Sequence, residues 1–306
     1  MRSRAATRTC AGIAMTALVA SSACTAPPDD DPFPWAPPPE LTVPQSTAAA
    51  PAGLPEVSEI PRTAVPPLPQ VELDRSFAAF SAAQPGTVAV SVAGAAAVQS
   101  FGDEPEVVAW STIKAALSIA AMRADPAAAR PLMVPAITVS DNDAGARLWA
   151  LLGPPARASA AVQDVLAEGR APASVPTTAI RPPYSPFGQT RWPGTHAATF
   201  AARLPCIRDA EPVLEQMRRL APEQSWGLAR DQEVAAKGGW GPEPNGDYLV
   251  RQIAVLPVQN GYVGVSLVAA AEDKKLSTGI AMVDRLADWV RQHRAALTAE
   301  PLRSCT

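Results

Sequence analysis

The sequence predicts an α+β domain, in which an antiparallel sheet is flanked by terminal helices and carries an inserted, reduced helical lobe. Patterns typical of strands occur near both ends of the globular part, whereas residues 110–220 combine helical spacing with loops. One helical pattern precedes the first strand and another follows the last strand. Strands from both ends can share one sheet only if the middle segment is inserted between them.

Each element follows from the spacing of its apolar residues. Helical spacing covers residues 71–84, and alternation typical of strands follows over 87–94 and 96–102. Three more strands are expected near the C-terminus, over residues 234–240, 251–257 and 261–270. The last helix places five apolar side chains on one face: Ile280, Val283, Leu286, Trp289 and Val290.

Residues 1–23 have the pattern of an export signal. Three arginines precede the apolar run AGIAMTALVA, which is too short to span a bilayer as a helix. The run ends in SSAC, which resembles the bacterial lipoprotein cleavage box, although Ser21 stands where that box usually has an aliphatic residue. We therefore expect export and lipidation of Cys24, which would anchor the protein on the outer face of the cell membrane. Ordinary signal-peptide cleavage followed by secretion is the alternative.

Residues 24–70 are expected to form an extended Pro/Ala-rich tether. Residues 25–69 hold 14 of the chain's 34 prolines, together with alanine, threonine and acidic residues. Such a composition cannot bury enough apolar surface to fold. The globular domain is therefore expected to span residues 71–306, which is long enough for one sizeable core.

The mature chain is expected to be acidic. The full sequence has a formal net charge of −3, and removing residues 1–23 takes away three arginines and no acid, which leaves −6. We therefore expect no nucleic-acid partner, because binding to a phosphate backbone needs a basic surface.

The cysteines leave one candidate disulfide. Cys10 leaves with the signal and Cys24 is the lipidation candidate, so Cys206 and Cys305 remain in the exported domain. They form a disulfide in an oxidising compartment, or they stay as two unpaired thiols.

The segment STIKAALSIAAM, residues 111–122, buries one of only four lysines in the chain. As a helix, it places Ser111 and Lys114 on one face, and apolar residues cover the rest. Burial and the helix N-terminus both favour the neutral amine, and a neutral amine beside a hydroxyl is a general base for nucleophilic attack. The alternative is a structural lysine that pairs with a carboxylate or a carbonyl.

Two further motifs follow in order, SDN at residues 140–142 and KGG at residues 237–239. Together with S-x-x-K, they are expected by chance on the order of 10⁻⁴ times in a chain of this composition. With these motifs, residues 72–294 resemble the superfamily of penicillin-binding proteins and serine β-lactamases. The local sequence around the motifs is most similar to that of class A β-lactamases. The segment THAATFAARL, residues 195–204, is similar to a helix that follows the Ω-loop of that family.

The resemblance implies a β-lactamase/transpeptidase-like fold and a role for each matched residue. These are Ser111 as nucleophile, Lys114 as base, Ser140 as proton shuttle, Asn142 as a substrate contact and Lys237 as carboxylate anchor. Gly239 and Trp240, which follow Lys237 on the same strand, are also expected to be substrate-binding residues. The implied oxyanion hole consists of the backbone N–H of Ser111 and an N–H of the strand near Trp240.

The chain also departs from class A β-lactamases. Residues 171–208 contain no Asp or Glu, although the family's Ω-loop carries a glutamate that activates the deacylating water. Gly238 stands where the family has Thr or Ser, and Arg251 on the next strand is the candidate replacement for the missing hydroxyl. Ser111 and Ser140 are about half as far apart as in typical class A chains, which implies a smaller helical lobe. We therefore expect slow deacylation and poor β-lactam turnover.

Other chemistries lack the residues that they need. A Ser-His-Asp triad would have to use His196 or His293, neither of which has a flanking motif, and no G-x-S-x-G occurs. We expect His293 to be a solvated residue on the last helix. No common metal-ligand spacing and no Gly-rich phosphate loop occur, so we expect no metal and no cofactor.

The sequence thus predicts a cell-envelope serine hydrolase that acts on a peptide, amide or ester through an acyl-serine. Its partners would be a cell-wall peptide or another small acyl substrate. The alternative is a non-catalytic lipoprotein that binds a wall peptide or a partner protein with the same site.

Overall fold

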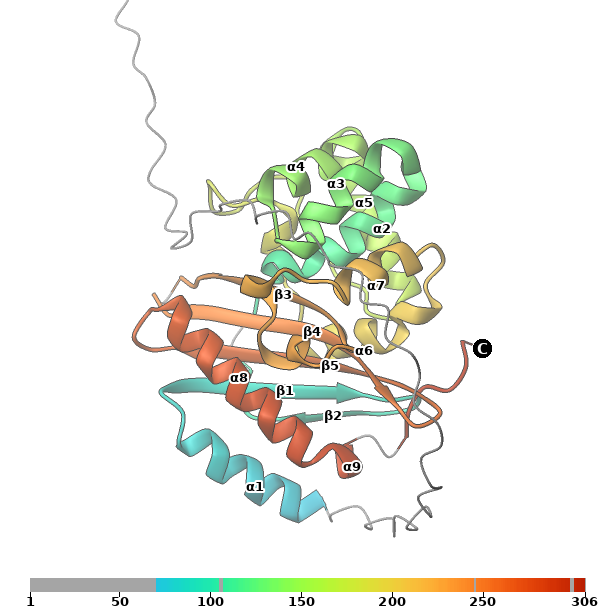
Figure 1. Ribbon diagram of the computed structural model, residues 1–306. Coiled ribbons are helices and arrows are strands. Elements are labelled where there is room, and N and C mark those ends of the chain that lie inside the picture. The colour runs from blue at the N-terminus through green and yellow to red at the C-terminus, as the bar shows by residue number, and fades with distance from the viewer. Residues whose placement is uncertain (1–69, 105–106, 245, 298–299, 306) are drawn as a thin grey trace, which may run out of the picture. The chain divides into compact units, whose positions relative to one another are not determined.

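The structure is a computed structural model that describes residues 70–104, 107–244, 246–297 and 300–305. The predicted signal, Cys24 and the predicted tether lie outside the described residues, except that Gln70 begins the first helix. Five strands form one antiparallel sheet in the order β2-β1-β5-β4-β3 (Figure 1). The predicted α+β class with an inserted helical lobe is therefore confirmed.

The strands lie where the alternating patterns predict them. They are β1 (Gly86–Ala93), β2 (Val98–Phe101), β3 (Ala235–Pro242), β4 (Tyr248–Val258) and β5 (Gly261–Ala271). β1 pairs with β5, with Val90 opposite Leu267, so the two ends of the chain join at the centre of the sheet. β3 lies at one edge, where alternate backbone N–H and C=O groups point away from β4.

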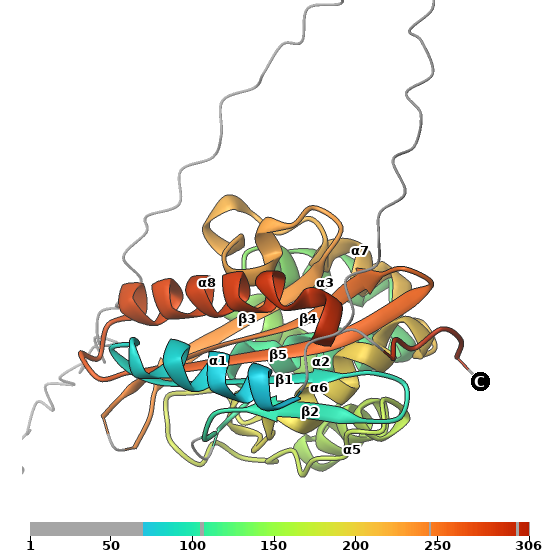
Figure 2. The ribbon, with the colours of Figure 1, turned by 90° about the horizontal axis from the view of Figure 1, so that it is seen from below.

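Helices cover both faces of the sheet and build the lobe (Figures 1 and 2). The terminal helices are α1 (Gln70–Ala82), α8 (Leu276–Gln292) and α9 (Arg294–Leu297). The longer helices between β2 and β3 are α2 (Lys114–Ala124), α3 (Pro126–Thr138), α4 (Asn142–Leu151), α5 (Pro155–Glu168), α6 (Gly194–Arg203) and α7 (Glu211–Met217). The short 3₁₀ turns are η1 (Trp110–Ile113), η2 (Phe187–Gln189), η3 (Leu204–Cys206), η4 (Pro222–Gln224) and η5 (Gly227–Arg230). α8 packs on one face of β5 and α6 on the other.

The interface between α1 and α8 changes the expected role of His293. Phe77 of α1 meets Trp289 of α8 edge to face, with ring centroids 5.0 Å apart. Ser76 Oγ lies 3.0 Å from His293 Nε2, and Trp289 Nε1 donates to the same Oγ at 3.1 Å. His293 is only 7% exposed, so the expectation of a solvated histidine is wrong. The packing of α1 against α8, which no local pattern reveals, buries it.

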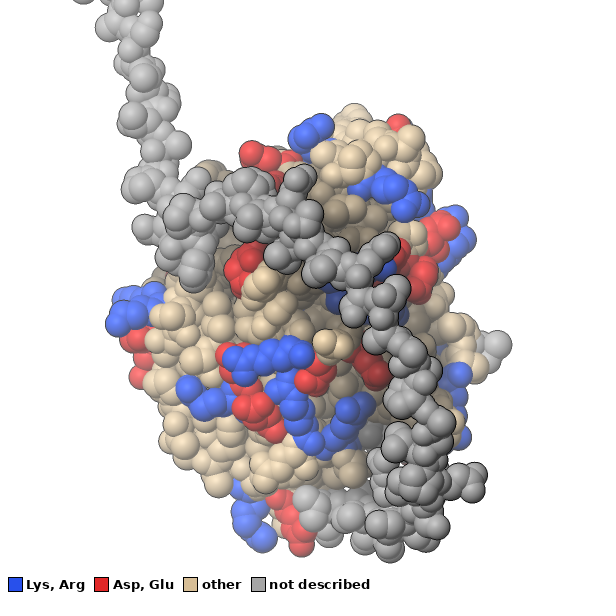
Figure 3. All heavy atoms as spheres, viewed as in Figure 1, with Lys and Arg blue, Asp and Glu red and all other residues tan. Residues whose placement is uncertain are grey.

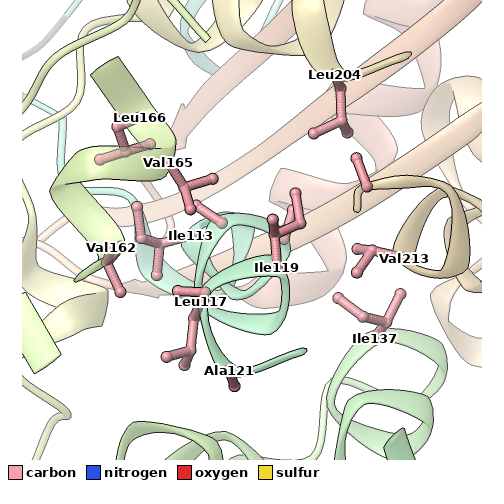
Figure 4. Close-up of a cluster of buried hydrophobic side chains, with 14 of the residues drawn as sticks. Ile113, Leu117, Ile119, Ala121, Ile137, Val162, Val165, Leu166, Leu204 and Val213 are labelled. Atoms are coloured by element: carbon pink, nitrogen blue, oxygen red, sulfur yellow. The ribbon is translucent and has the colours of Figure 1, made fainter. Parts of the chain in front are cut away.

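Helix α2 forms the centre of the lobe (Figure 4). All its residues from 114 to 122 are buried. Leu117 lies toward Val162 of α5, whereas Ile119 points toward Val213 of α7 (Figure 4). Because apolar side chains surround the helix, the amine of Lys114 must find its hydrogen-bond partners inside the protein.

The exposed face of α8 carries charges of both signs (Figure 3). Arg291 pairs with Asp231 and Asp288, and Asp284 pairs with Arg230. These pairs are partly or largely exposed, so each adds little to stability. Opposite charges alternate here, so this face presents no uniform field.

A disulfide and a β-bridge attach the C-terminal segment to the domain. Cys206 of η3 and Cys305 form a disulfide across a sequence separation of 99 residues. Leu302 also forms an antiparallel bridge with Tyr262 at the start of β5. The disulfide therefore closes a long loop that includes β3, β4, β5 and α8.

Removing the disulfide should destabilise the domain. With Cys206→Ser and Cys305→Ser combined, we expect the free energy of unfolding to fall by roughly 2–4 kcal/mol, because the long loop is no longer restrained in the unfolded chain. Urea unfolding of the wild-type and doubly substituted chains measures this difference. Equal midpoints in oxidising buffer would contradict the expectation.

Candidate active site

Ser111 lies at the junction between the sheet and the helical lobe. It is the second residue of η1, and α2 continues from Lys114, so the expected helix begins as a 3₁₀ turn. Trp110 has a φ of 47°, an uncommon left-handed conformation for a bulky residue, which turns the chain into the helix. Ser111 is partly exposed, whereas residues 112–122 are buried. Within the described part of the chain, its Oγ has no hydrogen-bond partner and can meet a ligand.

The amine of Lys114 is buried and makes three hydrogen bonds. Its Nζ donates to Ser140 O at 2.5 Å, to Asp141 O at 3.0 Å and to Asn142 Oδ1 at 2.9 Å. Burial lowers the pKa of Lys114 from 10.5 to about 7, against the opposing charge of Asp141. The amine therefore changes between its charged and neutral forms near neutral pH.

The turn at residues 140–142 connects α3 to α4. Ser140 has a φ of 60°, which directs its carbonyl toward Lys114 while its Oγ accepts from Lys237. Asp141 caps α4, because its Oδ1 accepts from Ala144 N at 2.7 Å. The turn thus brings Lys114 to the carbonyl of Ser140 and Lys237 to its hydroxyl.

Lys237 reaches the same turn from β3. Its Nζ donates to Ser140 Oγ at 2.8 Å and to Gly238 O at 2.9 Å, and the side chain is fully buried. Burial, together with the like charge of Lys114, lowers the pKa of Lys237 well below its ordinary value. An anion that enters beside it would therefore favour the ammonium form.

Two glycines allow β3 to lie directly against η1. A Cβ at Gly239 would come within 2.7 Å of Ser111 N and 2.8 Å of Thr112 N, and one at Gly241 within 2.3 Å of the Trp110 ring. The backbone N–H of Ser111 therefore adjoins the β3 backbone next to Trp240.

Arg251 lies beneath the site and has no exposed surface. Its Nη1 donates to Val108 O and to Trp192 O, both at 3.0 Å. Burial lowers its pKa to about 10, and the charges of nearby glutamates oppose this shift. The expectation that Arg251 replaces the missing hydroxyl does not fit this position. Its cross-strand neighbour on β3 is Gly239.

Trp226 fills the space beside Gly238. A Cβ at Gly238 would lie 2.4 Å from the Trp226 ring, and that ring meets Trp240 with centroids 6.4 Å apart. Gln252 Nε2 donates to Trp226 O at 2.8 Å and holds the loop in place. An indole therefore stands where the resemblance implies a hydroxyl. Trp226 carries no sequence signal, because it lies in an irregular loop before the KGG motif.

The loop that corresponds to the Ω-loop presents an aromatic ring to the site. Phe187 is 3% exposed, and a Cβ at Gly145 would lie 3.0 Å from Lys114 Cε and 3.6 Å from Phe187 Cζ. The buried amide of Gln189 makes hydrogen bonds within this loop, since its Nε2 donates to the carbonyls of Tyr184 and Ser185. The Phe187 ring and the stem of the Lys114 side chain therefore both lie against Gly145.

The chain matches no protein-family model and no curated protein sequence at a significant level. Its structure is similar to that of the TLA-3 extended-spectrum β-lactamase, with a TM-score of 0.60 over 74% of this chain and 100% of that enzyme at 12% identity. The chain has the class A β-lactamase fold. This finding confirms the fold that the three motifs implied.

Other structures with this fold give the same result. An ancestral class A β-lactamase has a TM-score of 0.53 over 72% of this chain and 99% of its own, at 17% identity. A putative class A β-lactamase, PenP, from Rhodopseudomonas palustris has a TM-score of 0.53 over the same shares, at 16% identity. These identities establish the β-lactamase-like fold and leave the reaction of this chain to its own residues.

Two further observations apply to the described residues. None of the described helices is both long and apolar enough to cross a bilayer. In the same part of the chain, no group of three or more His, Cys, Asp or Glu side chains is placed to hold a metal ion.

Proposed function

We propose that the protein is a cell-envelope serine hydrolase that acts on a peptide, amide or ester through an acyl-serine, with poor β-lactam turnover. The observation that carries the proposal is the convergence of three motifs. Lys114 and Lys237 both bind Ser140, and the backbone of Ser111 adjoins Gly239. A wall peptide or another small acyl compound is the substrate class that this site would take.

The proposed acylation follows from these positions. Ser111 Oγ attacks the substrate carbonyl carbon, and its proton passes to neutral Lys114 Nζ, which gives up one of its three acceptors. The N–H groups of Ser111 and Trp240 stabilise the oxyanion. As the carbonyl re-forms, Ser140 Oγ passes its proton to the leaving amine or alcohol and takes a proton from the Lys114 ammonium, which returns Lys114 to its neutral form. The product is an ester on Ser111.

Deacylation should be the slow step. The loop at residues 171–208 has no carboxyl group, and Phe187 occupies the side of the site next to Lys114. Without a general base to activate water, the acyl-serine should be hydrolysed about 10²–10⁴-fold more slowly. A β-lactam should therefore form a persistent adduct and be hydrolysed slowly.

The test is covalent labelling of the full chain with a fluorophosphonate and with a fluorescent penicillin, read by intact mass. We expect one adduct, which disappears in Ser111→Ala and remains in Ser118→Ala, a buried serine of helix α2 that serves as the control. Steady-state nitrocefin hydrolysis should stay far below roughly 1 s⁻¹, the lower end for typical enzymes. Labelling that survives Ser111→Ala, or rapid nitrocefin turnover, would contradict the proposal.

A second candidate function is a non-catalytic module that binds a wall peptide or a partner protein. The coordination of Lys114 favours it, since three acceptors saturate an ammonium and no hydrogen bond joins Nζ to Ser111 Oγ within the described residues. A folded chain that neither probe labels, yet that binds soluble wall peptides, would support this candidate.

We also propose that the protein is exported and anchored by a lipid on Cys24. In a bacterial host that processes lipoproteins, the full chain should then appear in the membrane fraction. Cys24→Ala should move it to the soluble fraction, because the lipid provides the attachment. Fractionation with immunodetection measures this, with Cys10→Ala as the control. An unchanged distribution for Cys24→Ala would contradict lipidation at this residue.

A further inference from the structure

A second site lies beside the C-terminal segment, away from the residues of the candidate active site. A cavity of about 550 Å³ is lined by Arg170, Arg203 and Arg303, with Glu300 as the carboxylate among its lining residues. Three positive charges and one negative charge give this lining a formal net charge of +2. The whole chain is acidic, so this concentration of positive charge is local.

The three arginines have no ion-pair partner among the described residues. The acids nearest in the sequence to Arg170 and Arg203 are already engaged, because Glu168 pairs with Arg123, and Asp209 pairs with Arg123 and Arg208. Burial and the positive charge of Arg170 both lower the pKa of Arg203. Arg170 and Arg203 therefore repel each other, and an anion between them would relieve that repulsion.

The cavity is built by long-range contacts. Arg203 is the last residue of α6, where the helix dipole favours a cation, and Arg170 follows α5 in a left-handed conformation with a φ of 55°. The remaining wall is the tail from Glu300 to Ser304. The Ala95 N–H donates to Glu300 O at 2.9 Å, and the disulfide fixes the end of the tail.

We propose that this cavity binds a phosphate group carried by a small organic molecule or by a lipid headgroup. Guanidinium groups match phosphate oxygens in pairs of parallel hydrogen bonds, and a dianion balances the net charge of the lining. The volume falls within the range of small-ligand sites, so a phosphate and an attached organic group both fit. The proposal does not depend on the hydrolase function.

Calorimetric titration of the full chain, with Cys24→Ser to remove any lipid, tests the site. The probes are inorganic phosphate and glycerol 3-phosphate. Arg170→Gln combined with Arg203→Gln should weaken binding by at least about tenfold, because two charge-assisted contacts are lost. The control is Arg130→Gln with Arg157→Gln, which changes the net charge equally at exposed positions and should keep the wild-type affinity.

Two more variants distinguish a built site from general attraction to a basic surface. Glu300→Gln should strengthen binding several-fold, because it removes the negative charge from the lining. Cys206→Ser with Cys305→Ser should weaken binding in a chain that circular dichroism shows to be folded, because the tail loses one attachment. No binding of either probe, or equal losses in the arginine pair and its control, would overturn the proposal.

Vesicle binding then identifies the source of the phosphate. Vesicles of phosphatidylcholine with phosphatidylglycerol should retain the Cys24→Ser chain through Arg170 and Arg203 if the ligand is a headgroup, whereas pure phosphatidylcholine should not. Binding of glycerol 3-phosphate without retention on vesicles supports a soluble ligand.

Discussion

Replacing Lys114 with methionine should slow acylation of Ser111 by about 10²–10⁴-fold, the contribution expected of a positioned general base. Methionine keeps the length and apolar stem of the side chain, so the substitution removes the amine with little change in packing. The acylation rate, followed with the fluorophosphonate and the fluorescent penicillin, measures the effect. Lys274→Met at an exposed position serves as the control and should leave the rate unchanged.

The pH profile separates a base from a merely structural lysine. The neutral amine accepts the proton, and burial lowers the pKa of Lys114 to about 7. The acylation rate should therefore rise about tenfold per pH unit below pH 7 and level off above it. A flat profile between pH 5.5 and 9, with a rate in Lys114→Met equal to that of the wild type, would show that Lys114 only supports the 140–142 turn.

Gly239→Ala should abolish most labelling of Ser111 while leaving the domain folded. The new methyl group would lie 2.7 Å from Ser111 N, 2.8 Å from Thr112 N and 3.1 Å from Ala109 O, all of them backbone atoms. Backbone cannot rotate away as a side-chain tip can, so β3 and η1 must separate. We expect a loss of about 10²–10³-fold in acylation rate, comparable to removing one oxyanion-hole donor.

Gly153→Ala is the matched control for this substitution. Gly153 has a φ of +93°, so alanine is strained there, but the atom nearest to the new Cβ is the flexible Arg157 Cδ at 3.6 Å. It should cost about 1 kcal/mol of stability and leave labelling unchanged. Thermal unfolding and labelling are measured on both variants. Equal labelling of Gly239→Ala and the wild type would mean that the strand does not supply the oxyanion contact.

Much of the fold is predictable from local patterns. Alternation in β1 and β5, and the apolar face from Ile280 to Val290, predict these elements because burial on one face selects residues at periods of 2 and 3.6. The order of the motifs predicts the β-lactamase-like arrangement, which the comparisons confirm. The burial of His293 is not predictable from a local pattern, because it depends on α1, which lies more than 200 residues away in the chain.

Some residues of the candidate site are likewise predictable from the sequence, and others are not. Ser111, Lys114, Ser140 and Lys237 are identifiable from spacing and from the cost of burying an amine. Trp226 and Phe187 are not, because they depend on which side chains lie against Gly238 and Gly145. The inward position of Arg251 is not identifiable either, because it depends on the carbonyls of Val108 and Trp192, which lie far away in the sequence.

The sequence by itself determined the fold class, the motif residues and the absence of an acid in the 171–208 loop, since these depend only on residue identity and spacing. Only the tertiary structure decided which oxygens hold Lys114, that β3 lies against η1, and that three arginines meet at the C-terminal tail. The physical reason is that close packing joins groups far apart in the chain, and such contacts depend on shape and volume, which local periodicity does not encode.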